Sequence, residues 1–205
     1  MALALKLCFG VLFWLRFLIQ FYFGRAQHVD RRVERRVWSW DKASRQREGG
    51  GATITGVVFF FLQMCFFAVY VANPGWLRRF ALPFPTWLRW TGVGLGLVSL
   101  SLLVWTHRVL GRQWSPYLKI QKDHRLVTEG PYRRVRHPMY SALFGWMISV
   151  SLIAANWIFL VILAGAASAV LLRIPREEAM LAGRFGDEFQ AYRSRAGLLL
   201  PRFWG

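Results

Sequence analysis

The stretch PMYSALFGWMISVSLIAANWIFLVILAGAASAVLL, residues 138–172, decides the fold of this chain because it contains no charged side chain. Its length suits two membrane-crossing helices joined by a tight turn near Asn156. A chain that leaves a membrane surface and returns to it brings its two flanking segments together. These segments are the polar clusters Arg136 to Tyr140 and Arg173 to Glu178. We therefore predict one polar site at one membrane surface, built from residues that bind charges of both signs.

The rest of the chain predicts an all-α integral membrane protein. Apolar residues make up 55% of the sequence and aromatic residues 17%, and several apolar runs approach the ~20 residues that a helix needs to cross the bilayer. The predicted spans are Leu3 to Phe23, Ala52 to Ala72, Trp90 to His107, Met139 to Ala155 and Trp157 to Leu172. The last two are short, so we expect them to pack as a hairpin. The prediction is thus about five transmembrane helices, with a C-terminal helical hairpin and a cytoplasmic amphipathic tail helix.

The positive charges orient these spans. With the N-terminus outside, 22 Lys and Arg residues fall on the cytoplasmic side and 3 on the outer side, which the positive-inside rule favours. The first span is expected to be an uncleaved helix, because Arg16 interrupts its apolar stretch. We expect a multi-pass protein whose site faces the cytoplasm.

The same charges argue against other classes of protein. The net charge of +17 comes from cations that border membrane spans, where they favour the anionic leaflet. No nucleic-acid-binding signature accompanies them, so no nucleic-acid partner is expected. Cys8 and Cys65 lie inside apolar spans, and the four scattered histidines form no zinc pattern, so no metal site is expected.

Two parts of the chain are expected. Residues 1–107 hold the first three spans and a cytoplasmic loop over 24–51; residues 108–205 hold a cofactor-binding loop, the hairpin 139–172 and the C-terminal helix. The Gly92-Val93-Gly94-Leu95-Gly96 run resembles a dinucleotide fingerprint, but it lies in an apolar span with no preceding strand. Gly92 and Gly96 instead predict a face that another helix approaches closely, as do the small residues 164–169.

The tail is predicted to form a helix from Pro175 to Arg195. Its apolar face would consist of Leu181, Phe185, Phe189 and Tyr192, which recur at helical spacing. Pro175 suits an early helical position, and Glu177 and Glu178 suit a first turn, where acids complement the helix dipole. This arrangement is a purely structural alternative for the two glutamates.

Four segments, Gln121 to Val127, Gly130 to Tyr132, Arg136 to Tyr140 and Arg173 to Glu178, resemble the isoprenylcysteine carboxyl methyltransferase family and its bacterial relatives. The wider group includes phospholipid methyltransferases. The resemblance extends from about Arg108 to the C-terminus, and the motifs are specific as an ordered set.

The resemblance implies S-adenosylmethionine as cofactor and a lipid-like substrate taken from the membrane. It also implies roles for individual residues. The implied cofactor contacts are Gln121, His124, Arg125, Leu126, Val127, Tyr132, His137, Pro138, Met139, Tyr140, Glu177 and, as an adjacent alternate, Glu178. The implied substrate contact is Arg173. The gap from Gln121 to His124 is shorter here than in the eukaryotic enzymes, which sets Gln121 apart from the rest of the set.

These residue types also suit the chemistry. S-adenosylmethionine carries an ammonium, a carboxylate, a sulfonium and a flat adenine. Glu177 can pair with the ammonium, and His124 or His137 with backbone amides can hold the carboxylate. Tyr132 and Tyr140 can line the adenosine.

The acceptor remains open between two chemical classes. A carboxylate is already nucleophilic, so Arg173 could orient it through two parallel hydrogen bonds without a base. A phospholipid amine must first lose a proton, so Glu178 or Tyr140 would have to act as base. Arg173 favours the acid and hence methyl ester formation, with Arg173 and Tyr140 as the catalytic candidates. Three alternatives stay open: a phospholipid amine N-methyltransferase, a sterol-type NADPH reductase and a non-catalytic membrane scaffold. The expected partners are the bilayer and a membrane lipid or lipidated small molecule.

Overall fold

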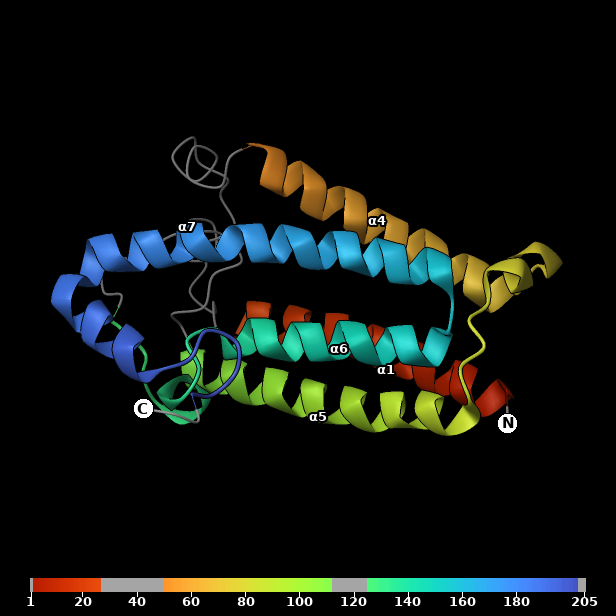
Figure 1. Ribbon diagram of the computed structural model, residues 1–205, viewed down its shortest axis with the longest axis horizontal. Coiled ribbons are helices and arrows are strands. Elements are labelled where there is room, and N and C mark those ends of the chain that lie inside the picture. Colours follow the sequence, from red (N-terminus) through yellow and green to blue (C-terminus); the bar gives the residue numbers. More distant parts are fainter. Residues whose placement is uncertain (1, 27–49, 112–124, 203–205) are drawn as a thin grey trace.

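The protein is seen in a computed structural model that describes residues 2–26, 50–111 and 125–202. Five long helices lie along the long axis of the molecule (Figure 1). They are α1 (Ala2–Ala26), α4 (Gly50–Ala72), α5 (Thr86–Leu110), α6 (Pro138–Ala154) and α7 (Trp157–Arg195), with short 3-10 turns η1 (Gly75–Phe80) and η3 (Gly130–Arg133). Each predicted span coincides with one of these helices, which confirms the all-α class.

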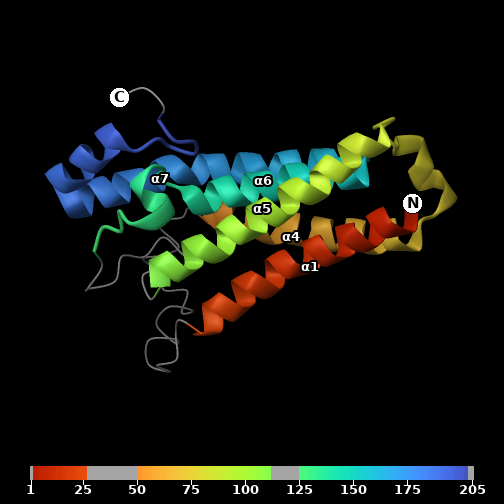
Figure 2. The same cartoon turned by 90° about the horizontal axis from the view of Figure 1, so that it is seen from below.

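Three of these helices, α1, α5 and α7, are long and apolar enough to cross a membrane. The other two, α4 and α6, contain shorter apolar stretches, Val57–Ala72 and Pro138–Ala154. Figure 2 shows α1 inclined to α6, so that the two ribbons diverge toward the end of the molecule that holds the C-terminus. We call this the C-terminal end and the opposite end, where Ala2 lies, the N-terminal end.

Aromatic side chains form the core between the helices. Phe9 and Phe13 of α1 are fully buried, and Phe66 of α4 stacks on Phe159 of α7 with ring centroids 4.3 Å apart. The buried Trp146 of α6 donates its indole N–H to the Leu12 carbonyl at 2.9 Å. Large rings from four helices therefore meet in one cluster, which fixes how α6 and α7 are held relative to α1 and α4.

Arg16 is the cation that interrupts the first span. Its guanidinium carbon lies 4.4 Å from the ring centroid of Phe17 and 5.3 Å from that of Trp146. The negative faces of these rings stabilise a cation in apolar surroundings. The first predicted span is thus a continuous helix despite its internal charge.

The predicted close approach at Gly92 and Gly96 is confirmed. A Cβ atom on Gly92 would lie 2.9 Å from the Ser149 carbonyl oxygen, and one on Gly96 would lie 2.5 Å from the Ser149 hydroxyl. The Ser149 hydroxyl donates to the Gly92 carbonyl at 2.7 Å. The glycines therefore serve the seam between α5 and α6, as the sequence predicted for a helix-packing face.

The turn between α6 and α7 lies where the sequence predicted it. Ala155 takes a left-handed conformation with φ of 47°, and Asn156 caps α7 by accepting from the Ile158 N–H at 3.0 Å. The backbone N–H of Leu82 donates to the Ala155 carbonyl at 2.7 Å. The hairpin thus closes at the N-terminal end of the molecule, and both of its polar flanks reach the opposite end.

The prediction of a separate tail helix that begins at Pro175 is wrong. The last helix, α7, runs without a break from Trp157 through Pro175 and departs from helical geometry only at Gly186, where φ is 50°. Proline removes one helical hydrogen bond, but packing on both sides of it, including the buried Ile174, holds the helix together. Glu177 and Glu178 consequently lie inside a helix, so a helix-start role does not account for them.

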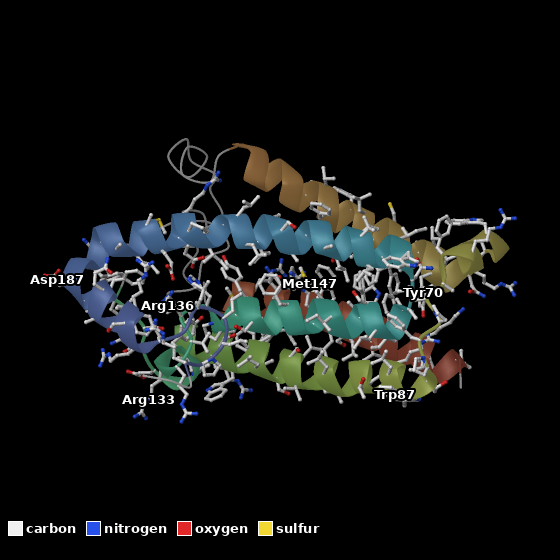
Figure 3. All side chains as sticks on the ribbon, in the orientation of Figure 1. Tyr70, Trp87, Arg133, Arg136, Met147 and Asp187 are labelled. Atoms are coloured by element: carbon white, nitrogen blue, oxygen red, sulfur yellow. The ribbon has the colours of Figure 1, made fainter. Side chains whose placement is uncertain are left out.

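The predicted apolar face of the tail is confirmed. Phe189, Tyr192 and Ala196 form a second buried cluster, against which Leu126, Leu181, Ala182 and Phe185 pack. Figure 3 labels Asp187 at the far tip of the C-terminal end. From there the chain turns back, and the last part of α7 approaches the segment before α6.

Candidate functional site

The two polar clusters meet at the C-terminal end of the molecule. His137 is the residue before α6, and Glu177 and Glu178 lie in the second half of α7. Direct side-chain contacts join α7 to the start of α6 and to the residues before it. The structure therefore brings together the imidazole and the carboxylates that the sequence predicted to converge.

Tyr140 and Glu177 form the first contact across the site. The Tyr140 hydroxyl donates to Glu177 Oε2 at 2.8 Å, and the pair is partly buried. Arg173 and Tyr132 both lie close enough to Tyr140 to interact with it electrostatically. One acid, one cation and two phenol rings thus gather around the first turn of α6.

Glu178 and Arg136 form the second contact. Arg136 Nε donates to Glu178 Oε1 at 2.7 Å, and the side chains are only 11% and 13% exposed. The Arg136 guanidinium also donates to the carbonyls of Ala196 and of Arg193. Arg193 Nε lies 3.8 Å from the other carboxylate oxygen of Glu178. Glu178 is therefore neutralised by cations of the chain itself.

His137 lies between these two pairs. Its side chain is 4% exposed, and Nε2 lies 3.4 Å from Glu178 Oε1. This Nε2 atom makes no hydrogen bond within the described residues. The ring stacks on Tyr140, with centroids 5.6 Å apart and an angle of 20° between the planes. A buried polar atom without a hydrogen bond is costly, so this nitrogen is suited to a ligand.

The turn η3 supplies one wall of the site. Tyr132 is buried, and its carbonyl accepts from the Tyr192 hydroxyl at 2.6 Å. Burial raises the pKa of Tyr132 above its usual value, and the nearby Glu177 carboxylate raises it further. The phenol therefore stays protonated, and neutral, throughout the physiological pH range.

The segment after α7, residues 196–202, returns across the entrance of α6; we call it the return segment. Its Gly197 carbonyl accepts from the Arg136 N–H at 2.8 Å, and its Leu198 carbonyl accepts from the His137 N–H at 3.1 Å. The Gly197 N–H donates to the Arg134 carbonyl at 3.0 Å. A Cβ atom on Gly197 would collide with the Leu200 carbonyl oxygen, so the tight turn here requires glycine.

The remaining predicted residues fall into three groups. Pro138 is buried and Met139 half-buried in the first turn of α6, next to His137 and Tyr140. Leu126 packs against the Phe189 cluster, Arg125 is exposed and Val127 is half-buried. Gln121 and His124 lie outside the described residues.

Two residues of the site were missing from the predicted set, Arg136 and Tyr192. Arg136 was quoted in the first polar cluster but given no role, although a cation beside one cluster and an acid in the other could have suggested their pairing. Tyr192 is predicted to lie on the apolar face of the tail and belongs to the stretch that carries the family resemblance, but it has no predicted role in the site. Its hydroxyl contact with a main-chain carbonyl leaves no signal in the sequence pattern. Figure 3 shows Arg136 at the same end as Asp187, away from Tyr70.

Comparisons with known proteins agree with this arrangement. The model of the isoprenylcysteine carboxyl methyltransferase (ICMT) family matches residues 92–183. The protein-S-isoprenylcysteine O-methyltransferase of Schizosaccharomyces pombe is 36% identical over 88 residues, which cover 40% of this chain and 36% of the relative. The nickel-cobalt-cadmium resistance protein NccN of Alcaligenes xylosoxydans xylosoxydans is 30% identical over 113 residues, which cover 55% and 53% of the two chains.

A solved structure is also similar. The structure of the eukaryotic intramembrane Ras methyltransferase ICMT matches with a TM-score of 0.50 and 25% identity, over 73% of this chain and 50% of that one. This chain thus spans about half the length of the relatives it matches, or less. The matched region contains the hairpin, His137, Tyr140 and both glutamates. Together with the apolar helices, these matches make the protein an integral membrane protein whose residues 92–183 are similar to the isoprenylcysteine carboxyl methyltransferase family.

Proposed function

We propose that this protein transfers a methyl group from S-adenosylmethionine to an acidic group on a lipid-like acceptor that resides in the membrane. The observation that carries the proposal is the convergence of Glu177 and the buried His137 Nε2 beside Tyr140. The similarity of residues 92–183 to the isoprenylcysteine carboxyl methyltransferase family supports the reaction class. The product would be a methyl ester.

The residues present fit the methyl donor. Glu177 provides the acid that an ammonium group requires. Within the described residues, His137 Nε2 is buried and makes no hydrogen bond, with Glu178 Oε1 3.4 Å away, and the N-cap of α6 makes no side-chain hydrogen bond to the helix. The first N–H groups of any helix lack helical acceptors, so Met139 and Tyr140 can offer backbone donors to a carboxylate. Tyr132 and Tyr140 supply aromatic surface for an adenine ring.

When bound, the donor supplies an electrophilic methyl group on a sulfonium. The protein's contribution is positioning and the exclusion of water. Tyr140 holds Glu177 in place through its hydroxyl. The stacked ring of His137 and the return segment restrict access from the aqueous side.

Arg173 supports a carboxylate as the acceptor. Its Nε atom is buried, and the side chain lies near Tyr140. A guanidinium presents two parallel donors to a carboxylate, and an ionised carboxylate needs no base at neutral pH. A protonated amine at the same place would be repelled, so the amine alternative is disfavoured.

The proposed topology places the N-terminus outside and the site at the cytoplasmic surface. The start of α6 and the second half of α7 lie at the end of the molecule opposite the N-terminus (Figure 1). Most of the cations of the sequence fall in the segments that join the first predicted span to the second and the third to the fourth, and after the last span, in accordance with the positive-inside rule. A water-soluble donor would thus enter from the cytoplasm.

The test uses full-length protein purified in detergent micelles. Calorimetric titration should give saturable binding of S-adenosylhomocysteine and no binding of NADPH. Incubation with methyl-labelled S-adenosylmethionine and N-acetyl-S-farnesylcysteine should then yield a lipid-extractable label that is released by mild base, as an ester requires. Binding of NADPH alone would defeat the proposal in favour of a reductase. Base-resistant label in the phospholipid headgroups of co-purified membrane would favour the amine methyltransferase.

A further inference from the structure

The two neighbouring glutamates of α7 have different surroundings. Successive residues of a helix point about 100° apart around its axis. Glu177 therefore reaches Tyr140 inside α6, whereas Glu178 reaches Arg136, before α6 begins. Glu177 is contacted by a neutral phenol, and Glu178 by a guanidinium.

We propose that Glu178 is a positioning residue, which acts through Arg136 and the return segment to hold His137, while Glu177 is the carboxylate that contacts the ligand. This inference rests on the proposed function for the class of ligand. It removes Glu178 from the predicted set of cofactor contacts. The two acids then have different roles, ligand contact for Glu177 and positioning for Glu178.

The charge balance around Arg136 supports this division. Arg136 is 11% exposed at its side chain, and Glu178 is the acid at 2.7 Å from it. Removal of one partner from a buried ion pair leaves an uncompensated charge, which is strongly unfavourable. If Glu178 turned toward the ammonium of a ligand, Arg136 would lose this partner. The contact between Glu177 and Tyr140 involves a neutral hydroxyl, so breaking it leaves no uncompensated charge.

The hydrogen bonds of Arg136 connect Glu178 to the return segment. Besides Glu178, the guanidinium donates to the Ala196 carbonyl and to the Arg193 carbonyl at 3.2 Å. Arg193 lies in the last turn of α7, and Ala196 is the first residue after the helix. The ion pair thus fixes the point at which the return segment leaves the helix.

The return segment in turn holds His137. The His137 N–H donates to the Leu198 carbonyl at 3.1 Å, and the Arg136 N–H donates to the Gly197 carbonyl at 2.8 Å. One turn into α6, the Ser141 hydroxyl donates to the Leu199 carbonyl. Three successive residues of the return segment therefore bind the entrance of α6. Displacement of this segment would release the backbone that carries the imidazole.

Two ligands can separate contact from positioning. S-adenosylhomocysteine carries an amino group and a carboxylate, whereas 5′-methylthioadenosine carries the same nucleoside without either. Glu177→Gln should weaken binding of S-adenosylhomocysteine by about 10- to 100-fold, the usual loss for a charged hydrogen-bond partner, and leave methylthioadenosine within about threefold. Glu178→Gln should weaken both ligands by the same factor. Titration calorimetry in detergent measures all four affinities.

Amide hydrogen exchange of the ligand-free protein tests the positioning role without any cofactor. Glu178→Gln and Arg136→Gln should each raise exchange at the N–H groups of Arg136, His137 and Gly197, and the double variant should exchange no faster than either single one. Glu177→Gln serves as the matched control and should leave this exchange unchanged. Glu178→Asp, which keeps the charge, should restore part of the protection and part of the affinity for both ligands.

The outcomes are distinguishable. A selective loss of S-adenosylhomocysteine binding in Glu178→Gln, like that expected for Glu177→Gln, would overturn the inference and make Glu178 a ligand contact. Unchanged exchange in both Glu178→Gln and Arg136→Gln would overturn it as well. If the unaltered protein binds neither nucleoside, the proposed function fails, while the exchange measurements still decide whether Glu178 holds the return segment. If Glu178→Gln fails to fold, Glu178→Asp and Arg136→Lys provide the same comparison.

Discussion

The two ends of the helical bundle satisfy their polar groups in different ways. At the N-terminal end, Arg89 donates to the Ile153 carbonyl at 2.7 and 3.0 Å, and Asn156 donates to the Leu77 carbonyl at 3.3 Å. These acceptors are main-chain atoms. At the C-terminal end the acceptors include carboxylates, and all five acids of the described residues lie between Glu129 and Glu188.

The two ends therefore differ in role: the N-terminal end holds the helices together, and the C-terminal end is suited to bind a ligand. A cation bound to main-chain carbonyls ties loops together and keeps its charge. The described residues of the N-terminal end include no acid that could bind a ligand. The C-terminal end balances cations against acids and still contains an imidazole nitrogen without a hydrogen bond in the described part of the chain. Substitutions at the N-terminal end should therefore change stability alone, and substitutions at the C-terminal end should change ligand affinity first.

The largest expected effect is on ligand affinity at the C-terminal end. His137→Ala should reduce the affinity for S-adenosylhomocysteine by about 1–3 kcal/mol, because a buried hydrogen-bonding partner of the ligand is lost. Calorimetric titration measures the change. Ser168→Ala, which removes an exposed hydroxyl bonded within its own helix, is the control and should bind normally. Equal affinities for His137→Ala and the unaltered protein would contradict the view that substitutions at the C-terminal end act on ligand affinity.

The corresponding change at the N-terminal end is Arg89→Met. It deletes both donors to the Ile153 carbonyl, so the free energy of unfolding should fall by about 1–2 kcal/mol. Unfolding by titration with sodium dodecyl sulfate in mixed micelles measures this loss. Affinity for S-adenosylhomocysteine should stay within about twofold, because the site lies at the far end. A large loss of affinity would show that the two ends are coupled.

Asn156 allows two contacts at the N-terminal end to be separated. Asn156→Ala should cost about 1 kcal/mol of unfolding free energy, because α7 loses its N-cap. Asn156→Ser keeps an oxygen acceptor for the Ile158 N–H and loses the donation to Leu77, so it should cost less. The same micellar unfolding assay compares the two variants. Equal losses would assign the stabilisation to the contact with Leu77.

The smallest effect is expected for Tyr192→Phe. This change removes the hydroxyl that donates to the Tyr132 carbonyl and keeps the ring in the Phe189 cluster. The expected loss is about 0.5–1.5 kcal/mol of unfolding free energy. The affinity for 5′-methylthioadenosine should also fall slightly, because Tyr132 lines the proposed nucleoside site. A loss of stability with unchanged affinity would show that Tyr192 has a purely structural role, as Arg89 and Asn156 do at the N-terminal end.

Hydropathy was sufficient to predict most of the fold. The uncharged stretch 138–172 gave two helices with a turn at Asn156, and the spacing of Gly92 and Gly96 gave the seam of α5 and α6. The uncharged stretch reflects burial in an apolar environment, and the glycine spacing reflects side-chain size. Both properties can be read from a single sequence. The break predicted between Leu172 and Pro175 was wrong, because local propensity treats Pro175 as a helix start, whereas α7 continues through it to Arg195.

The candidate site was predictable in its residue types and less so in its contacts. The convergence of His137, Tyr140 and the glutamates followed from the hairpin, although their roles remain proposals. The pairing of Arg136 with Glu178 did not follow, because sequence spacing does not reveal which of two adjacent acids faces which neighbour. The return segment was also missed. Its bonds to Arg136 and His137 use main-chain atoms, which every residue possesses and no motif records.

Pro175 has a mechanical consequence for α7. Proline lacks the N–H that would bond to the Leu171 carbonyl. One helical hydrogen bond is therefore absent at Pro175, a position two residues before Glu177. The stretch of α7 from Trp157 to Phe185, before the departure from helical geometry at Gly186, is about 43 Å long by its rise per residue, which exceeds the thickness of the hydrocarbon layer. The missing hydrogen bond lowers the bending stiffness of this stretch between Arg173 and Glu177, where an acceptor from the bilayer and a donor from water would have to come together.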